Sequence, residues 1–196
     1  MSYYHVSLEQ DWKLTKSEFA QVVLDVEKEE LGINAGLQDR VVQTFGGLVH
    51  MDFSQLQTVE GSTSGIKAGR YTALDPSLLP PLYLAYNTIA GGDSGQVHST
   101  VRDRWLSRDA ELIDGMTQLG SLADRARECL LQNKVHLLPE LMDQNIRLRR
   151  RLYGDAVVGQ VNIEAIEIAQ AHGLAAKFSG SGGALVCLRC DEPTDW

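Results

Sequence analysis

The sequence lacks the features that mark a secreted or membrane-embedded protein. The residues after Met1 form neither a basic segment nor an apolar segment, so no signal peptide is expected. No apolar run reaches the roughly 18 residues that a membrane-spanning helix needs. The three cysteines are too few for a disulfide framework, and they favour a reducing compartment. These absences predict a soluble, cytoplasmic protein without a membrane partner.

Positive charge is also scarce. The chain has 18 Lys and Arg residues against 26 Asp and Glu residues, which gives a formal net charge of −8. Because the phosphates of nucleic acids bind clustered lysines and arginines, this balance argues against nucleic acid as a partner. An anionic small molecule remains compatible with it, since such a ligand needs only a few local positive groups. The 196 residues suffice for one sizeable domain or two small ones.

The hydrophobic pattern predicts an α+β fold with a helical block between strands. Thr15 and Glu18 form a capping-box pair at the expected start of the first helix. Helices are expected over residues 15–31, 37–44, 98–106, 109–133, 134–153 and 162–171. Strands are expected over residues 48–53, 82–86, 174–178 and 184–188. The second of these reads as a buried strand, whereas the polar, glycine-rich residues 54–69 are expected to form a loop.

Asp39 is the first candidate for a catalytic role. It follows a glycine-bearing loop and lies in the first turn of the helix expected over residues 37–44. A carboxylate in such a place can orient or deprotonate a hydroxyl group for phosphoryl transfer. Negative charge also stabilises the start of a helix, so position alone favours a structural role for Asp39.

A glycine cluster, Ser-Gly-Ser-Gly-Gly at residues 179–183, separates the last two expected strands. Clustered glycines allow positive φ and let the backbone approach a phosphate closely. No Gly-Lys-Ser/Thr sequence follows, and the next element is a strand. The cluster is therefore neither a Walker loop nor a dinucleotide-binding fingerprint. Taken alone, it is more typical of a tight hairpin turn.

Two further segments could bind an anion. Ser94, His98 and Arg102 lie where a polar loop leads into a helix, and a helix start with hydroxyl groups and an arginine can hold an anion. Residues 147–151 contain four arginines, of which Arg150 could bind a sugar carboxylate bidentately. The alternative interpretations are a capped surface helix for the first segment and a solvated helix end for the second.

The order of these segments is more specific than any one of them. Ala-Gly-Leu-Gln-Asp39-Arg is followed by Gly-Gly-Leu-Val-His-Met-Asp-Phe53, by the Ser94 segment, and by Lys177-Phe-Ser-Gly-Ser-Gly-Gly. In this order the motifs resemble the GHMP kinase superfamily over residues 17–188, and within it the glucuronokinases most. The resemblance implies an ATP- and Mg²⁺-dependent sugar-1-kinase that converts D-glucuronate to D-glucuronate 1-phosphate.

The resemblance also implies roles for particular residues. Asp39 corresponds to the catalytic base, and Glu27 lies about where an acidic Mg²⁺ ligand is expected, with Glu29 and Glu30 as neighbouring alternatives. The third motif of the superfamily, which shapes the phosphate and substrate region, is matched by Gly180, Ser181, Gly182 and Gly183. The roles of Ser94, His98, Arg102 and Arg150 in holding the sugar come from their chemistry alone.

The chain departs from the superfamily before Asp39. The Gly-Leu-Gly-Ser-Ser-Ala type loop that cradles ATP does not occur among the 38 residues that precede Asp39. The chain is therefore interpreted as an internal piece: a fragment, a splice form or a truncated gene model. Residues 1–75 are expected to be a remnant of the N-terminal, ribosomal S5 domain 2-like domain. Residues 76–196 are expected to be an incomplete ferredoxin-like C-terminal GHMP domain.

The missing loop leaves alternatives open. Phosphoryl transfer depends on positioned donors around the phosphates, so the 196-residue chain alone is expected to have little kinase activity. A non-catalytic GHMP-fold protein is one alternative, and a kinase for another sugar, such as galactose or a heptose phosphate, is a second. The oligomeric state stays open.

Overall fold

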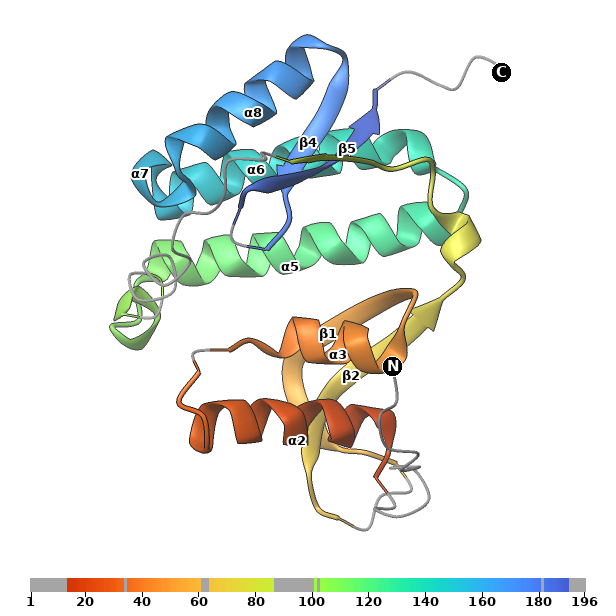
Figure 1. Ribbon diagram of the computed structural model, residues 1–196, viewed down its shortest axis with the longest axis vertical. Coiled ribbons are helices and arrows are strands. Elements are labelled where there is room, and N and C mark those ends of the chain that lie inside the picture. Colours follow the sequence, from red (N-terminus) through yellow and green to blue (C-terminus); the bar gives the residue numbers. More distant parts are fainter. Residues whose placement is uncertain are drawn as a thin grey trace. The chain divides into compact units, whose positions relative to one another are not determined.

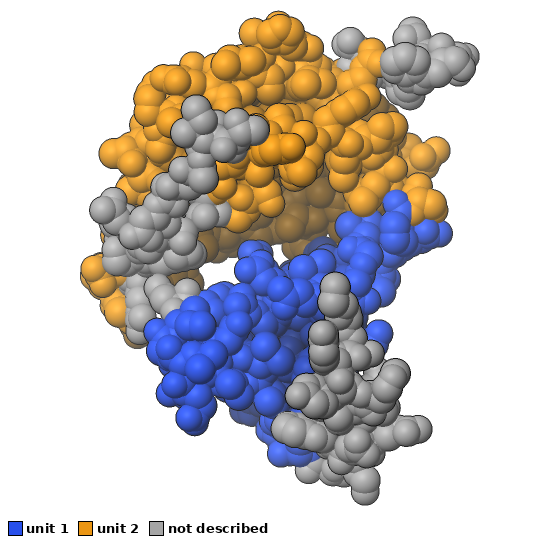
Figure 2. All heavy atoms as spheres, viewed as in Figure 1, with its two compact units in different colours: residues 1–76 blue, residues 77–196 orange. Residues whose placement is uncertain are grey.

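The computed structural model describes residues 14–33, 35–60, 64–86, 101, 103–180 and 182–190. The chain divides into two compact units, Met1–Pro76 and Ser77–Trp196, which Figure 2 shows in different colours. The division falls one residue from the boundary expected after residue 75. Each unit contains helices and antiparallel strands, which confirms the α+β class. No helix in the described ranges is long and apolar enough to cross a membrane.

The first unit combines two helices with a two-stranded antiparallel hairpin (Figure 1). Its elements are α2 (Lys16–Glu29), α3 (Leu37–Phe45), β1 (Leu48–Thr58) and β2 (Lys67–Leu74). Both predicted helices are confirmed, but the loop predicted over residues 54–69 is wrong at both ends, because β1 continues through Thr58 and β2 begins at Lys67. From Phe53 onward β1 is exposed, so its polar residues reflect contact with solvent rather than absence of a strand.

The start of α2 has the predicted capping box. The N–H of Glu18 donates to the Thr15 hydroxyl oxygen at 3.3 Å, and the N–H of Thr15 donates to Glu18 Oε2 at 2.8 Å. The Glu18 side chain is fully buried and also accepts a hydrogen bond from the Ser64 hydroxyl. Through Ser64, the capping box therefore ties the connection between β1 and β2 to the start of α2.

The second unit contains a three-stranded antiparallel sheet and a set of helices. The strand order is β3 (Tyr83–Tyr86), β5 (Ala184–Arg189), β4 (Leu174–Phe178). The helices are α5 (Ala110–Leu131), α6 (Leu138–Tyr153), α7 (Asp155–Val158) and α8 (Gln160–Ala171). The three strand predictions in this unit are confirmed, but β3 is exposed along its whole length rather than buried. Because β3 pairs only with β5 in the described sheet, it is an edge strand, and its apolar sequence does not report burial.

Two of the predicted helices differ in detail from the structure. The helix predicted over residues 134–153 begins as a 3₁₀ turn, Val135–Leu137, and becomes α-helical at Leu138 with a proline in its first turn. Residues 103–106 of the helix predicted over 98–106 are helical, whereas residues 98–100 and 102 lie outside the described residues. In the helix predicted over residues 134–153, the proline explains the change from a 3₁₀ turn to an α-helix, because proline fits the first turn of an α-helix but not its interior.

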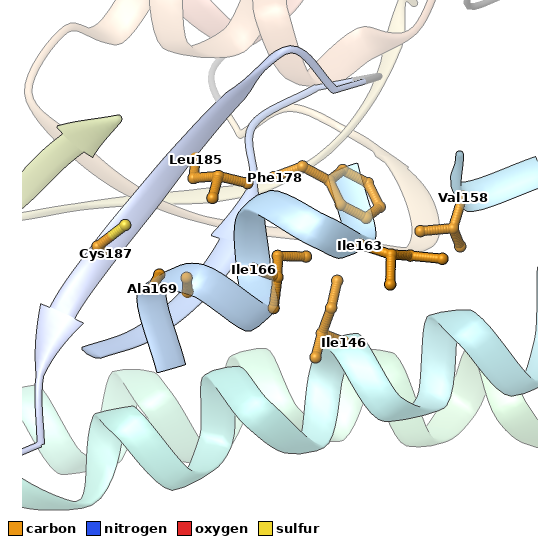
Figure 3. Packing of buried hydrophobic residues seen from close by; sticks show 9 residues of the cluster. Ile146, Val158, Ile163, Ile166, Ala169, Phe178, Leu185 and Cys187 are labelled. Atoms are coloured by element: carbon orange, nitrogen blue, oxygen red, sulfur yellow. The ribbon is translucent and has the colours of Figure 1, made fainter. Parts of the chain in front are cut away.

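The main core of the second unit lies between the β4–β5 hairpin and the helices α6 and α8. Figure 3 shows Ile163 and Ile166 of α8 close to Ile146 of α6, in the same cluster as Phe178 and Leu185 from the two strands. Each of these five side chains is at most 7% exposed. Phe178 ends β4 and Leu185 is the second residue of β5, so the core holds the strands on both sides of the glycine turn that joins them.

Candidate active site

The first group of candidate residues lies in the first unit, where α2 ends and α3 begins. Gly36 is the N-cap of α3 and provides no side-chain hydrogen bond, so Asp39 supplies the negative charge of the first turn. The Asp39 side chain is 76% exposed. The first turn of a helix suits an acid that only stabilises the helix, and it also suits an acid that binds a substrate. Because the Asp39 side chain is exposed, a substrate can reach it.

Arg40 joins Asp39 to Glu27. Its Nη2 donates to Glu27 Oε1 at 2.6 Å, and its Nε lies 2.5 Å from Glu27 Oε2. Its Nη1 donates to Asp39 Oδ2 at 3.3 Å and to the Gly36 carbonyl at 3.2 Å. The hydrogen bond with Glu27 raises the pKa of Arg40 above its ordinary value. Sequence reasoning missed Arg40, although it directly follows Asp39 in the quoted motif.

The surroundings of Glu27 do not fit a Mg²⁺ site. Both of its carboxylate oxygens face Arg40, so a metal ion could bind there only by displacing this ion pair. Mg²⁺ prefers octahedral oxygen coordination, and the described part of the chain brings no three His, Cys, Asp or Glu residues together as a metal site. Mg²⁺ ligation by Glu27 stays a prediction, and the contacts seen here are those of a residue that holds Arg40.

The glycine cluster forms the turn of the β4–β5 hairpin in the second unit. The Ser179 N–H donates to the Ala184 carbonyl at 2.8 Å, and the Gly182 N–H donates to the Ser179 carbonyl at 3.3 Å. Gly180, Gly182 and Gly183 have φ values of 61°, 123° and 79°, which side-chain-bearing residues rarely adopt. The hairpin interpretation is confirmed. Phosphate binding by this turn stays a prediction, and Ser181 lies outside the described residues.

Two basic residues flank this turn. Lys177 lies two residues before it in β4, and its ammonium donates to the Phe178 carbonyl at 3.3 Å. Burial lowers the pKa of Lys177, and the positive charge of Arg149 lowers it further. The Arg149 guanidinium lies 5.5 Å from the Phe178 ring centroid. A bound anion nearby would favour the charged form of Lys177 and so oppose both effects.

Arg150, the predicted sugar ligand, is engaged elsewhere. Its Nε and Nη2 donate to the two carboxylate oxygens of Asp155 at 2.8 and 2.7 Å, and its Nη1 lies 3.8 Å from Glu167 Oε1. The hydrogen bonds from Arg150 lower the pKa of Asp155. Arg150 therefore links α6 to α7 and α8, and a sugar carboxylate would have to share or replace Asp155. The other residues predicted to hold the sugar, Ser94, His98 and Arg102, lie outside the described residues.

A groove of about 400 Å³ lies between α5 and α6, and none of the predicted site residues line it. Arg125, Arg147 and Arg151 line it together with glutamine, serine and leucine side chains. Arg147 also pairs with Glu140 at 2.9 Å. Arg147 and Arg151 thus share this groove, whereas Arg149 and Arg150 make their contacts elsewhere.

The chain is similar in sequence to two curated proteins. The chain is 50% identical over 173 residues to "Glucuronokinase 1" of Arabidopsis thaliana, a match that covers 88% of this chain and 46% of the relative. It is 48% identical over 174 residues to "Probable glucuronokinase 2" of the same plant, with the same coverage. The chain is a glucuronokinase homologue. The predicted resemblance to glucuronokinases is confirmed as homology over this region.

This homology covers only part of the relatives. The chain spans about half the length of the curated glucuronokinases that it matches. No family profile and no solved structure matches the chain. The activity of the whole protein is therefore a matter for proposal.

Proposed function

We propose that the chain contributes the catalytic carboxylate and a phosphate-binding turn to an ATP-dependent kinase that phosphorylates D-glucuronate at its anomeric hydroxyl. The homology to glucuronokinases carries this proposal, because the aligned region includes most of the chain. In this proposal the first unit belongs to the N-terminal GHMP domain and the second to the ferredoxin-like C-terminal domain. An antiparallel sheet packed against helices in the second unit supports that assignment.

Asp39 acts on the sugar hydroxyl. Its Oδ2 contacts Arg40, so Oδ1 is the oxygen that a hydroxyl group can approach. The hydroxyl proton passes to Asp39 as the sugar oxygen bonds to the γ-phosphorus of ATP, and the bond from that phosphorus to the β-phosphate oxygen breaks to release ADP. Arg40 contacts the carboxylate through its Nη1, and Glu27 in turn holds Arg40.

The turn at residues 179–183 receives phosphate groups. Its Gly182 and Gly183 N–H groups already have acceptors, whereas that of Gly180 meets no acceptor within the described part of the chain. The Gly180 N–H, together with Lys177 and Arg149, can therefore bind an anion. ATP fits this end of the hairpin through its phosphates. ATP use and Mg²⁺ use are both part of this proposal, and the homology to glucuronokinases supports them.

A chimera tests this function. In it, this chain replaces the matching 173-residue region of the Arabidopsis glucuronokinase 1, and a coupled assay follows ADP release with ATP, Mg²⁺ and D-glucuronate. We expect turnover with D-glucuronate and little with galactose or a heptose phosphate. A folded chimera that binds neither substrate, measured beside the active relative, would contradict the proposal and favour a non-catalytic protein. Preference for another sugar in the panel would change the substrate but keep the kinase.

A further inference from the structure

Asn162, which the sequence analysis did not single out, connects the glycine turn to the start of α8. Its Nδ2 donates to the Val158 carbonyl at 2.7 Å, and its Oδ1 accepts the Gly183 N–H at 2.9 Å. The first bond ties the amide to the last residue of α7, and the second reaches 21 residues along the chain. A side chain that makes both bonds must have a donor and an acceptor on one short stem, which an asparagine provides.

Packing provides a second, independent sign of the same contact. A Cβ atom added to Gly182 would lie 2.7 Å from Asn162 Oδ1 and closer still to Nδ2. By contrast, a Cβ atom on Gly180 or Gly183 would meet nothing within 4 Å. Gly182 is therefore needed for the close approach of Asn162 as well as for its φ of 123°.

These contacts determine which part of the turn is available to a ligand. The β ladder holds Ser179, and Asn162 holds Gly183 and packs on Gly182. Among the described residues of the turn, Gly180 is the one whose N–H group meets no acceptor in the described part of the chain. We propose that Asn162 is a positioning residue, which fixes the turn so that its Gly180 end faces the phosphates. The inference rests on the proposed phosphate role of the turn.

Amide hydrogen exchange of the 196-residue chain, read at Gly183 by NMR, tests the positioning without any kinase assay. Asn162→Ala removes the acceptor, so we expect Gly183 exchange to become roughly twofold to tenfold faster. Asn162→Asp keeps an acceptor for the Gly183 N–H but loses the donor to the Val158 carbonyl, so it should restore only part of the protection. Gln160→Ala is the matched control, since Gln160 lies in the same helical turn but bonds Glu164 at 3.0 Å. Unchanged Gly183 exchange in a folded Asn162→Ala chain would overturn the inference.

A double-mutant cycle tests the steric contact. Gly182→Ala strains φ in either background, but it meets the Asn162 side chain only when that side chain is present. We therefore expect Gly182→Ala to lower the midpoint of thermal unfolding less in an Asn162→Ala background than in the native one. Additive effects would show that Asn162 and Gly182 do not press on each other, and would count against the inference.

Measuring turnover distinguishes the positioning of the turn by Asn162 from the proposed phosphate-binding role of the turn. In the active chimera, Asn162→Ala should lower kcat about tenfold to a hundredfold, because displaced phosphate groups react poorly, while the KM for the sugar changes little. Asn162→Asp should recover part of the loss, and Gln160→Ala should keep normal turnover. If Gly183 exchange rises but kcat does not fall, the positioning stands and the phosphate role of the turn fails.

Discussion

Replacement of Glu27 by glutamine distinguishes a residue that holds Arg40 from a Mg²⁺ ligand. The Glu27 and Arg40 side chains are 21% and 15% exposed, so the pair lies between a surface ion pair and a buried one. Surface pairs contribute about 0–1 kcal/mol, and loss of one partner of a buried pair costs about 3–5 kcal/mol. Glutamine keeps one oxygen for the Arg40 Nη2. We therefore expect Glu27→Gln to lower the free energy of unfolding of the first unit by about 1–2 kcal/mol.

The assay is urea unfolding of the chain, with and without Mg²⁺, in a double-mutant cycle of Glu27→Gln and Arg40→Met. If Glu27 holds Arg40, its loss costs the same with and without Mg²⁺, and costs little once Arg40 is already methionine. Glu29→Gln is the matched control, because Glu29 lies in the same final turn of α2. The reasoning would be refuted if the Glu27→Gln chain were as stable as the native chain without Mg²⁺ but were no longer stabilised by Mg²⁺. That result would establish Glu27 as a metal ligand.

Three further predictions concern other residues. Asp39→Asn in the active chimera should cut kcat by orders of magnitude and lower the thermal midpoint only slightly, whereas near-normal turnover would reduce Asp39 to a helix-start residue. Hydrogen bonds from Ser54 and Arg70 lower the pKa of Asp52 to about 2. Because the pKa of Asp52 is lower in the folded than in the unfolded chain, this stabilisation is complete above about pH 4 and disappears as the pH falls toward 2. Asp52→Asn should therefore remove that pH dependence from acid unfolding, and an unchanged acid-unfolding profile would contradict the prediction. Gly115→Ala should destabilise the second unit by about 1–3 kcal/mol in urea unfolding, because its Cβ would lie 2.5 Å from Leu152 Cδ1, and full stability would show that Leu152 can move aside.

Features that depend on neighbouring residues could be predicted from the sequence. The capping box of α2 needs only residues three positions apart, and the glycine turn needs only its own φ values. The prediction over residues 54–69 failed because a polar, exposed hairpin has no buried face to mark its strands. For β3, the apolar sequence suggested burial, but burial depends on the number of strands beside it.

Contacts between distant residues could not be predicted in this way. Arg40 bonds Glu27 across 13 positions, and Asn162 bonds Gly183 across 21, so neither pair leaves a periodic signal. Each pair forms only because packing brings two element ends together. The motif marked Asp39 and the glycines, but it gave no sign of which side chains hold them in place.

The arginines of α6 show why the choice of an anion ligand needs the structure. Charge alone made Arg150 a candidate, yet Asp155 binds its guanidinium through two hydrogen bonds. Arg149 has no carboxylate partner within the described residues. Its guanidinium lies over the Phe178 and Tyr153 rings, and its Nε donates to the Asn145 side chain. An incoming anion can approach Arg149 without first breaking an ion pair, whereas at Arg150 it must compete with Asp155. Since Phe178 directly precedes the glycine turn, Arg149 and Lys177 are the better-placed cations for a phosphate at that turn.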